Sequence, residues 1–292
     1  MDNIFLTLTH YSIDNIIYDF YIQNKHTGIG NMLFQISSCL AYSIKYNKNL
    51  CVPALDVYLK KENLQKQDSI FRNICSDCPA EYFEIKNDHV KYSQDCGNEN
   101  REFILNILPY KNMNFFGYIE NWKNFIDYRE QILNCFRPIQ TDVDYIYNKY
   151  PILNKNITNI DNICSIHVRL GSDYLKIPSL KAQIMNYQKG YHDCLDHMIQ
   201  QKKIATVFVF TDNKDYCRKI FDTNPKYSDI KFIYSYERDY IDVWTISLIK
   251  NNIVSMSTMA WWGSFLNEYE DKYIVCYKTN RPDLHYPGWI VI

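Results

Sequence analysis

Short apolar runs separated by helical stretches make up most of the chain, and the run at residues 163–168 is the clearest of them. A nearly continuous apolar run of this length is typical of a strand buried on both faces, as in a parallel sheet. Polar residues gather at its end: His167, Arg169, Gly171, Ser172 and Asp173. Ligands of open α/β sheets bind just beyond the carboxyl ends of the strands. An arginine there can clamp a phosphate, whereas the alternative interpretation is a solvated Arg–Asp pair.

The second half of the chain alternates predicted strands with predicted helices. Strands are predicted at residues 204–210, 231–234, 253–254 and 272–277. Helices are predicted at residues 189–201 and 214–221, around Ile241, Trp244 and Leu248, and around Trp261 and Trp262. This alternation predicts a parallel sheet with helices on both of its faces.

The first half shows the same alternation less clearly. Strands are predicted at residues 4–8, 50–53 and 115–118, and an amphipathic segment at residues 122–136. The turn Gly28-Ile29-Gly30-Asn31 opens a helical pattern that extends to about Tyr46. A glycine turn before a helix offers backbone N–H groups to an anion, although an ordinary loop explains the same residues.

Three stretches have no clear period and suggest where the domains divide. Residues 10–27 are predicted to form a loop or an irregular hairpin, and residues 56–112 to form excursions on the rim of the first domain. Residues 145–161, rich in Asn, Lys and Tyr, predict a linker. The predicted domains are therefore residues 1–155 and 156–292. Two such lobes would form a cleft for a nucleotide and a second substrate.

Composition narrows the class of protein. The chain has 292 residues, of which 47% are hydrophobic, so it can build real cores. Its 32 basic and 33 acidic residues give a net charge of −1, which does not indicate nucleic-acid binding. No apolar run reaches the ~18 residues that span a bilayer, and the N-terminus lacks a signal-peptide pattern. We therefore expect a soluble, cytoplasmic protein whose ten cysteines are reduced.

Two groups of residues raise the question of a metal. Cys75, Cys78, His89 and Cys96 have the residue types of a structural zinc site, but no second CxxC supports it. A metal-dependent transferase usually carries an Asp-x-Asp. The one such string here, Asp142-Val-Asp144, lies in a polar segment and is predicted to start a solvated helix. The sequence does not decide whether these residues bind zinc, and no divalent metal is expected to take part in catalysis.

The polar clusters of the second lobe are expected to converge, because parallel strands end on the same side of a sheet. His167, Arg169 and Asp173 follow one predicted strand, Thr211-Asp212 the next, and Ser257-Thr258 another. Ser257 and Thr258 also precede a helix, where hydroxyl and N–H groups suit a phosphate. The alternative for Ser257-Thr258, and for Asp212, is a helix cap.

Several motifs, in order along the chain, resemble glycosyltransferase family 11, the α-1,2-fucosyltransferases. Gly28-Ile-Gly-Asn-Met-Leu-Phe-Gln35 is similar to the family's Gly-Gly-x-Gly-Asn-Gln-Met-Phe-Gln opening, and His167-Val-Arg169 to its His-x-Arg-Arg-Gly-Asp-Tyr motif. Val209-Phe-Thr-Asp212 matches its Phe-Ser-Asp segment, and the stretch from Asp242 to Gly263 its closing Ser-Thr-x-x-Trp-Trp-Gly block. The family's second Arg is Leu170 here, and Arg-Leu-Gly-Ser-Asp is more similar to protein O-fucosyltransferases.

This resemblance implies a GT-B-like α/β fold of two Rossmann-like lobes with a nucleotide-sugar cleft between them. It implies transfer of L-fucose from GDP-β-L-fucose to a glycan, with inversion and without a divalent metal. Arg169 would hold the diphosphate and stabilise the charge that develops on the leaving GDP. Asp173, Asp212 and Asp242 would bind the ribose or guanine, Ser257 and Thr258 a phosphate, and Gly28, Gly30 and Asn31 the same diphosphate from the first lobe. The resemblance is also compatible with a contact between His167 and the base.

Two other functions compete with this one. The donor can carry another deoxysugar, such as rhamnose on dTDP, UDP or GDP, because the second Arg is absent. The chain can also be a non-catalytic glycan- or nucleotide-binding protein of the same fold. Inversion calls for a base at the acceptor hydroxyl. Glu120 follows the predicted strand at residues 115–118 and is a candidate, and its alternative is a surface carboxylate. The acceptor and the linkage stay open.

Overall fold

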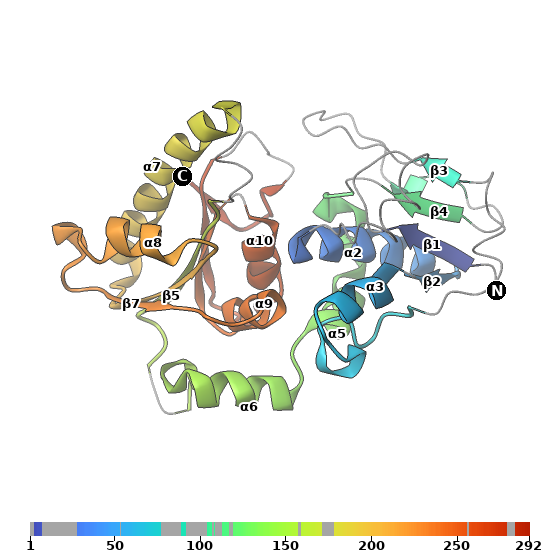
Figure 1. The fold of residues 1–292 in the computed structure, drawn as a ribbon, viewed down its shortest axis with the longest axis horizontal. Coiled ribbons are helices and arrows are strands. Elements are labelled where there is room, and N and C mark those ends of the chain that lie inside the picture. The colour runs from blue at the N-terminus through green and yellow to red at the C-terminus, as the bar shows by residue number, and fades with distance from the viewer. Residues whose placement is uncertain are drawn as a thin grey trace. The chain divides into compact units, whose positions relative to one another are not determined.

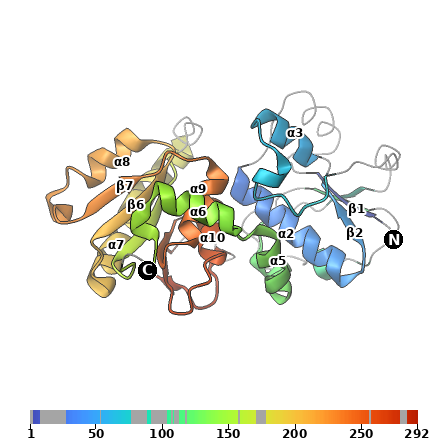
Figure 2. The same cartoon turned by 90° about the horizontal axis from the view of Figure 1, so that it is seen from below.

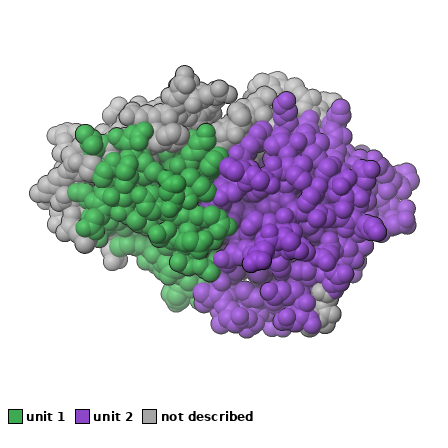
Figure 3. Space-filling model, turned by 180° about the vertical axis from the view of Figure 1, so that it is seen from behind, with its two compact units in different colours: residues 1–137 green, residues 138–292 purple. Residues whose placement is uncertain are grey.

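The chain folds into two compact α/β units, Met1–Arg137 (unit 1) and Pro138–Ile292 (unit 2), coloured separately in Figure 3. The structure is a computed structural model. It describes residues 3–7, 28–52, 54–76, 89–91, 104–106, 108, 113–116, 119–156, 159–170, 178–255, 257–278 and 284–292. The predicted loop or hairpin at residues 10–27 lies outside the described residues.

Unit 1 contains a parallel four-stranded sheet of order β2-β1-β4-β3. Its strands are β1 (Asn3–Thr7), β2 (Asn49–Cys51), β3 (His89–Lys91) and β4 (Met113–Phe116). Its helices are α2 (Ile29–Lys45), α3 (Ala54–Lys61), α5 (Arg129–Phe136) and the short 3-10 turns η1 (Lys66–Asp68), η2 (Ile104–Asn106), η3 (Trp122–Asn124) and η4 (Ile126–Tyr128). The predicted strands at residues 4–8, 50–53 and 115–118 correspond to β1, β2 and β4.

Helix α2 carries much of the core of unit 1. Every residue from Met32 to Cys39 is buried, so α2 is enclosed around most of its circumference; Figure 1 shows it beside the strands of unit 1. The ring of Phe34 packs against Phe125 with centroids 5.9 Å apart, and the ring of Tyr42 meets Phe115 edge-on at 4.9 Å. These contacts join α2 to η3 and to β4, so the helix packs against the sheet as a second layer.

Unit 2 contains a parallel six-stranded sheet of order β10-β9-β8-β5-β6-β7. Its strands are β5 (Ile163–Val168), β6 (Thr206–Thr211), β7 (Lys231–Tyr234), β8 (Asn251–Val254), β9 (Tyr273–Cys276) and β10 (Ile290–Val291). Its helices are α6 (Gln140–Lys149), α7 (Pro178–Lys202), α8 (Lys214–Phe221), α9 (Asp239–Ser247), α10 (Thr258–Phe265) and the short turns η5 (Pro151–Leu153) and η7 (Pro225–Tyr227).

The strand order of unit 2 reverses between β5 and β8. From β5 the chain moves outward through β6 to the edge strand β7, and then returns to β8 on the other side of β5. Right-handed crossovers consequently put α7 and α8 on one face of the sheet and α9 and α10 on the other (Figures 1 and 2). A ligand crevice is expected beyond the carboxyl ends of the two strands at this reversal, β5 and β8.

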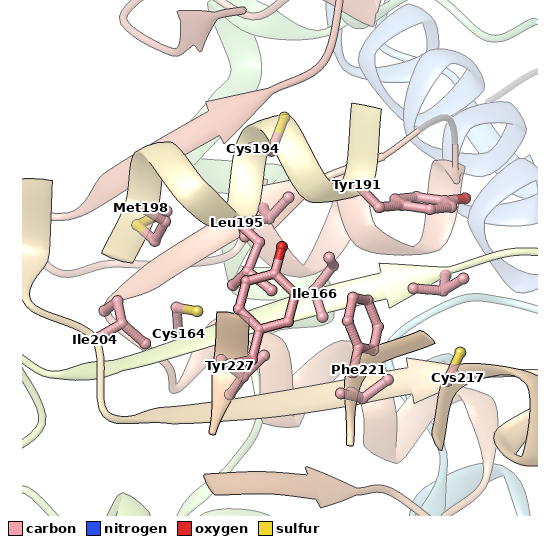
Figure 4. Close-up of a cluster of buried hydrophobic side chains, with 14 of the residues drawn as sticks. Cys164, Ile166, Tyr191, Cys194, Leu195, Met198, Ile204, Cys217, Phe221 and Tyr227 are labelled. Carbon is pink, nitrogen blue, oxygen red and sulfur yellow. The ribbon is translucent and has the colours of Figure 1, made fainter. Parts of the chain in front are cut away.

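A hydrophobic cluster fills the space between the sheet and helices α7 and α8 (Figure 4). Alternate residues of β5, Cys164, Ile166 and Val168, belong to this cluster and are fully buried. Successive side chains of a strand point to opposite faces, so Ser165 and His167 face α9 and α10 instead. The opposite face of β5 is therefore partly polar, although the strand is buried along its whole length.

The polar residues on this second face are joined by hydrogen bonds. The buried Asn252 side chain donates to Ser165 Oγ at 2.8 Å and to the carbonyls of Ile246 and Ile249 at 3.1 and 3.0 Å. Its Oδ1 accepts a bond of 2.8 Å from Asn267. This network ties β5 and β8 to the end of α9, so it fixes the spacing of the strands that carry the candidate site.

The predicted linker at residues 145–161 contains the end of α6 and the turn η5. Helix α6 is bound to unit 2, because Tyr145 donates to Glu237 at 2.8 Å and Lys149 pairs with Glu237 at 3.0 Å. The ring of Tyr150 also packs edge-on against Phe208 of β6 at 5.4 Å. The units accordingly divide between Arg137 and Pro138, before the boundary predicted after residue 155.

Candidate functional site

The carboxyl ends of β5 and β6 bring Arg169 and Asp212 together. The residues are 43 positions apart in the chain, yet Arg169 Nη1 lies 2.8 Å from Asp212 Oδ2. The other carboxylate oxygen of Asp212 accepts from the Leu170 N–H at 2.9 Å. Tyr191 of α7 donates to the Arg169 carbonyl at 3.4 Å. The guanidinium is therefore oriented from two strands, while 44% of its side-chain surface stays exposed to a ligand.

His167 is the last buried polar residue before this edge. Its side chain is 6% exposed, and burial lowers the pKa of His167 to about 4. The charge of Asp212 opposes this shift, and the charge of Arg169 adds to it. The imidazole is consequently neutral at physiological pH. Its Nδ1 is buried and has no hydrogen-bond partner among the described residues.

Ser257 and Thr258 lie at the carboxyl end of β8, where α10 begins. Ser257 is the N-cap of this helix, and its hydroxyl accepts from the Met259 N–H at 3.2 Å. Its own N–H donates to Ser255 Oγ at 3.3 Å. The cap interpretation of Ser257 is thus confirmed. The N-terminus of α10 lies at the β5–β8 reversal, which is a suitable position for a bound phosphate. A phosphate contact by Ser257 and Thr258 stays a prediction.

Asp242 lies in the first turn of α9, beyond the end of β7. The hydroxyl of Ser235, the residue after β7, donates to its carboxyl group. Burial raises the pKa of Asp242 to about 8. This value includes smaller effects: the charges of Asp239 and Glu237 also raise the pKa of Asp242, while the Ser235 bond and the charge of Lys214 lower it. A carboxyl group in this state can donate or accept a proton near neutral pH.

The remaining predicted donor-binding residues are divided between unit 1 and the part of the chain that is not described. Gly28 is the N-cap of α2, and its carbonyl accepts from the N–H groups of Asn31 and Met32 at 3.0 and 3.1 Å. Gly30 and Asn31 form the first turn of the same helix. Asp173 lies outside the described residues. A role of these residues in donor binding stays a prediction.

Glu120 is buried, with 5% of its surface exposed, so the interpretation as a surface carboxylate is wrong. The helix-start interpretation of Asp142-Val-Asp144 is confirmed, because the Asp142 carboxylate accepts from the Ile139 N–H at 2.9 Å in the first turn of α6. Within the described ranges, no three His, Cys, Asp or Glu side chains gather as a metal site. Cys78 and Cys96 and the side chain of His89 fall outside those ranges.

The sequence pattern described as Glycosyl transferase family 11 matches residues 85–290, more than two thirds of the chain. The chain belongs to glycosyl transferase family 11. The expected family is thereby confirmed, and this family member is a glycosyltransferase. The matched range includes all of the strand-end residues in unit 2.

Relatives and solved structures agree with this assignment. An alpha-1,2-colitosyltransferase of Escherichia coli is 25% identical over 269 residues, covering 83% of this chain and 86% of that protein. The O-antigen biosynthesis glycosyltransferase WbnK of Escherichia coli is 28% identical over 183 residues, or 60% of this chain and 59% of that protein. A crystal structure of POFUT1 in complex with GDP matches with a TM-score of 0.52 at 10% identity, over 94% of this chain and 97% of that chain. The predicted GT-B-like α/β fold is confirmed.

Three residues outside the family motifs, Ser235, Lys214 and Tyr236, also lie at this edge of the sheet. All three follow a strand at the same edge as Arg169, and Ser235 holds the carboxyl group of Asp242. Applying the rule of polar strand ends to the predicted strand at residues 231–234 would have found Ser235 and Tyr236.

None of the described helices combines the length and the apolar character that a membrane crossing requires.

Proposed function

We propose that this family 11 glycosyltransferase transfers L-fucose from GDP-β-L-fucose to a hydroxyl group of a glycan acceptor, in an α-1,2 linkage and with inversion at the anomeric carbon. The observation that carries the proposal is the Arg169–Asp212 pair at the carboxyl ends of β5 and β6, beside the strand-order reversal of unit 2. The family, a relative named for an α-1,2 transfer and a fold shared with a fucosyltransferase-type structure that binds GDP support it.

Arg169 is proposed to bind the diphosphate and to act in the transfer itself. When the bond between the sugar and the diphosphate breaks, negative charge develops on the leaving oxygen. A guanidinium already oriented by Asp212 stabilises that charge without having to reorganise. Because a guanidinium stays protonated and presents its donors in a planar fork, it suits a diphosphate better than an ammonium group does.

The neighbouring residues are proposed to bind the rest of the donor. Ser257 and Thr258, at the N-terminus of α10, contact a phosphate, where the positive end of the helix favours an anion. Asp212 and Asp242 bind the ribose and the base. The neutral His167 supplies a hydrogen bond from the wall of the same edge. We propose that Arg169 and the helix terminus together take the place of a divalent metal.

The experiment compares donor binding and transfer in the wild type and in two arginine variants. Arg169→Ala removes the proposed diphosphate ligand, whereas Arg129→Ala removes a half-buried arginine of unit 1 that pairs with Glu130. We expect Arg169→Ala to weaken GDP binding at least tenfold and to lower kcat about 100-fold or more. Arg129→Ala should match the wild type. Unchanged GDP affinity and transfer in Arg169→Ala would refute the assignment, and loss of transfer in EDTA would refute metal independence.

A second candidate donor carries colitose, because a relative similar over most of its length is named a colitosyltransferase. The absence of the family's second Arg, replaced by Leu170, fits a donor that differs in its sugar. Parallel assays with nucleotide-activated fucose, colitose and rhamnose on one acceptor panel separate these donors. The fucose proposal fails if one of the other sugars is transferred with a clearly higher kcat/KM.

A further inference from the structure

The end of β7 carries an exposed aromatic ring that the transfer mechanism does not yet use. Tyr236 follows Ser235 at this end and keeps 62% of its surface exposed. Two cations of α8 hold its side chain. Lys214 Nζ lies 3.3 Å from the ring centroid, and Arg218 donates to the Tyr236 hydroxyl at 2.6 Å. An exposed tyrosine with both its ring and its hydroxyl engaged has lost much of its rotamer freedom, so it can bind a planar ligand at low entropic cost.

We propose that Tyr236 and Lys214, together with Asp242, form the subsite that binds the nucleobase of the donor and selects guanine. This inference rests on the proposed GDP-sugar transfer and extends it to two residues outside the family motifs. Tyr236 would stack on the base, while Lys214 and Asp242 would contact the edge of the base.

The position of the cluster fits the direction in which a bound nucleotide extends. The diphosphate is proposed to lie at Arg169 beside β5. Neighbouring strands are about 4.8 Å apart, so the end of β7 lies about 10 Å across the sheet, on the far side of β6. Asp212, at the end of β6, lies between the two positions and faces the ribose. Lys214 begins α8 only two residues after Asp212, so one loop carries a ribose ligand and a base ligand.

The two charged groups of the cluster complement guanine. Guanine presents the O6 acceptor beside donors at N1 and N2, and adenine presents the reverse order at the equivalent positions. A carboxylate at Asp242 accepts from N1 and N2, and an ammonium at Lys214 donates to O6. The two side chains flank the same strand end, because Ser235 donates to Asp242 and Lys214 lies over the ring of the next residue, Tyr236. Uracil offers a single ring N–H on that edge, so it satisfies the carboxylate less well.

Tyr236 could instead only cover the edge strand β7, in which case it would make no contact with a ligand. The two roles predict different results for truncation of the ring. Loss of a base stacked on an aromatic side chain weakens binding about 5- to 100-fold, whereas loss of an edge cover leaves ligand affinity unchanged.

The test measures by calorimetry the affinity of wild type, Tyr236→Ala and Tyr236→Phe for GDP and for ribose 5-diphosphate, which lacks the base. We expect Tyr236→Ala to lose about 5- to 100-fold in GDP affinity and nothing in ribose 5-diphosphate affinity. Tyr236→Phe keeps the ring and should stay within about twofold of the wild type for both ligands. Lys214→Met should reduce the ratio of GDP to ADP affinity about tenfold, because adenine presents a donor where guanine presents the O6 acceptor.

Each outcome of this test decides something. If the wild type binds GDP and Tyr236→Ala binds it equally well, the base subsite is refuted while the proposed transfer stands. An equal loss of GDP and ribose 5-diphosphate affinity in Tyr236→Ala also refutes it, because the effect is then not on the base. If the wild type binds neither ligand, the proposed function and the subsite fail together.

Discussion

Replacement of Asp242 by Asn tests whether burial of this carboxyl group destabilises the folded protein. Asn has the same shape, and its Oδ1 can still accept from the Ser235 hydroxyl. It cannot ionise. In the wild type, burial and the charges of Asp239 and Glu237 raise the pKa of Asp242 from 3.8 to about 8. The folded protein therefore disfavours the ionised carboxylate that the unfolded chain carries above about pH 4.

The sign of the effect follows from the two pKa values. Below pH 3.8 the carboxyl is protonated in both states, and Asp242 carries no ionisation cost. Between pH 3.8 and about 8 the unfolded chain is ionised while the folded one holds its proton, so the stability of the wild type falls as the pH rises. At about 1.36 kcal/mol for each pH unit, the cost reaches about 4 kcal/mol at pH 7.

Urea unfolding of the wild type and Asp242→Asn between pH 5 and pH 8 measures this cost directly. We expect the variant to be more stable, with an advantage that grows by about 2.7 kcal/mol between pH 5 and pH 7. Asp215→Asn is the matched control: it makes the same change in the first turn of α8, where the side chain is 95% exposed. Its effect should not depend on pH in this way. An advantage of Asp242→Asn that stays constant from pH 5 to pH 8 would refute the reasoning.

The same substitution should weaken GDP binding, because an amide cannot accept from both N1 and N2 of the base. In the wild type, binding would then release a proton, and GDP affinity should rise from pH 6 to pH 8 as the carboxyl ionises more easily. Calorimetry in two buffers of different ionisation enthalpy detects that proton. A group that destabilises the fold but is needed for the ligand is expected at a functional site.

Two further predictions concern the packing that supports the edge. Asn252→Ala removes an amide whose two N–H groups are shared among three acceptors and whose oxygen accepts one bond, all in a buried network. We expect a loss of about 3 kcal/mol or more, seen as a lower urea midpoint at unchanged slope, and a loss below ~1 kcal/mol would contradict the network's role. Gly263→Ala puts a methyl group 2.5 Å from Ile246 Cβ, so α9 and α10 must separate at a cost of about 1–3 kcal/mol. The control Gly28→Ala, whose added methyl group meets no atom within 4 Å, should lose much less, and equal losses would argue against the close contact.

The order of strands and helices in unit 2 could be predicted from the sequence, because it depends on near neighbours. The predicted strand at residues 163–168 is β5, and the predicted helix at residues 214–221 is α8. Parallel pairing then required Arg169 and Asp212 to meet, and their atoms lie 2.8 Å apart. The family motifs lie on these same elements, which is why the family could be identified before the fold was known.

Other features depend on residues far away in the chain, and only the tertiary structure decided them. Strand β3, His89–Lys91, has no apolar run of its own and exists through its pairing with β4. Helix α6 belongs to unit 2 because Tyr145 and Lys149 meet Glu237, about 90 residues later. The elevated pKa of Asp242, the neutral His167 and the ring of Tyr236 held by α8 likewise arise from burial and charge brought together by folding. Local periodicity determines which segments form strands and helices, whereas the chemistry of a side chain depends on the neighbours that long-range packing gives it.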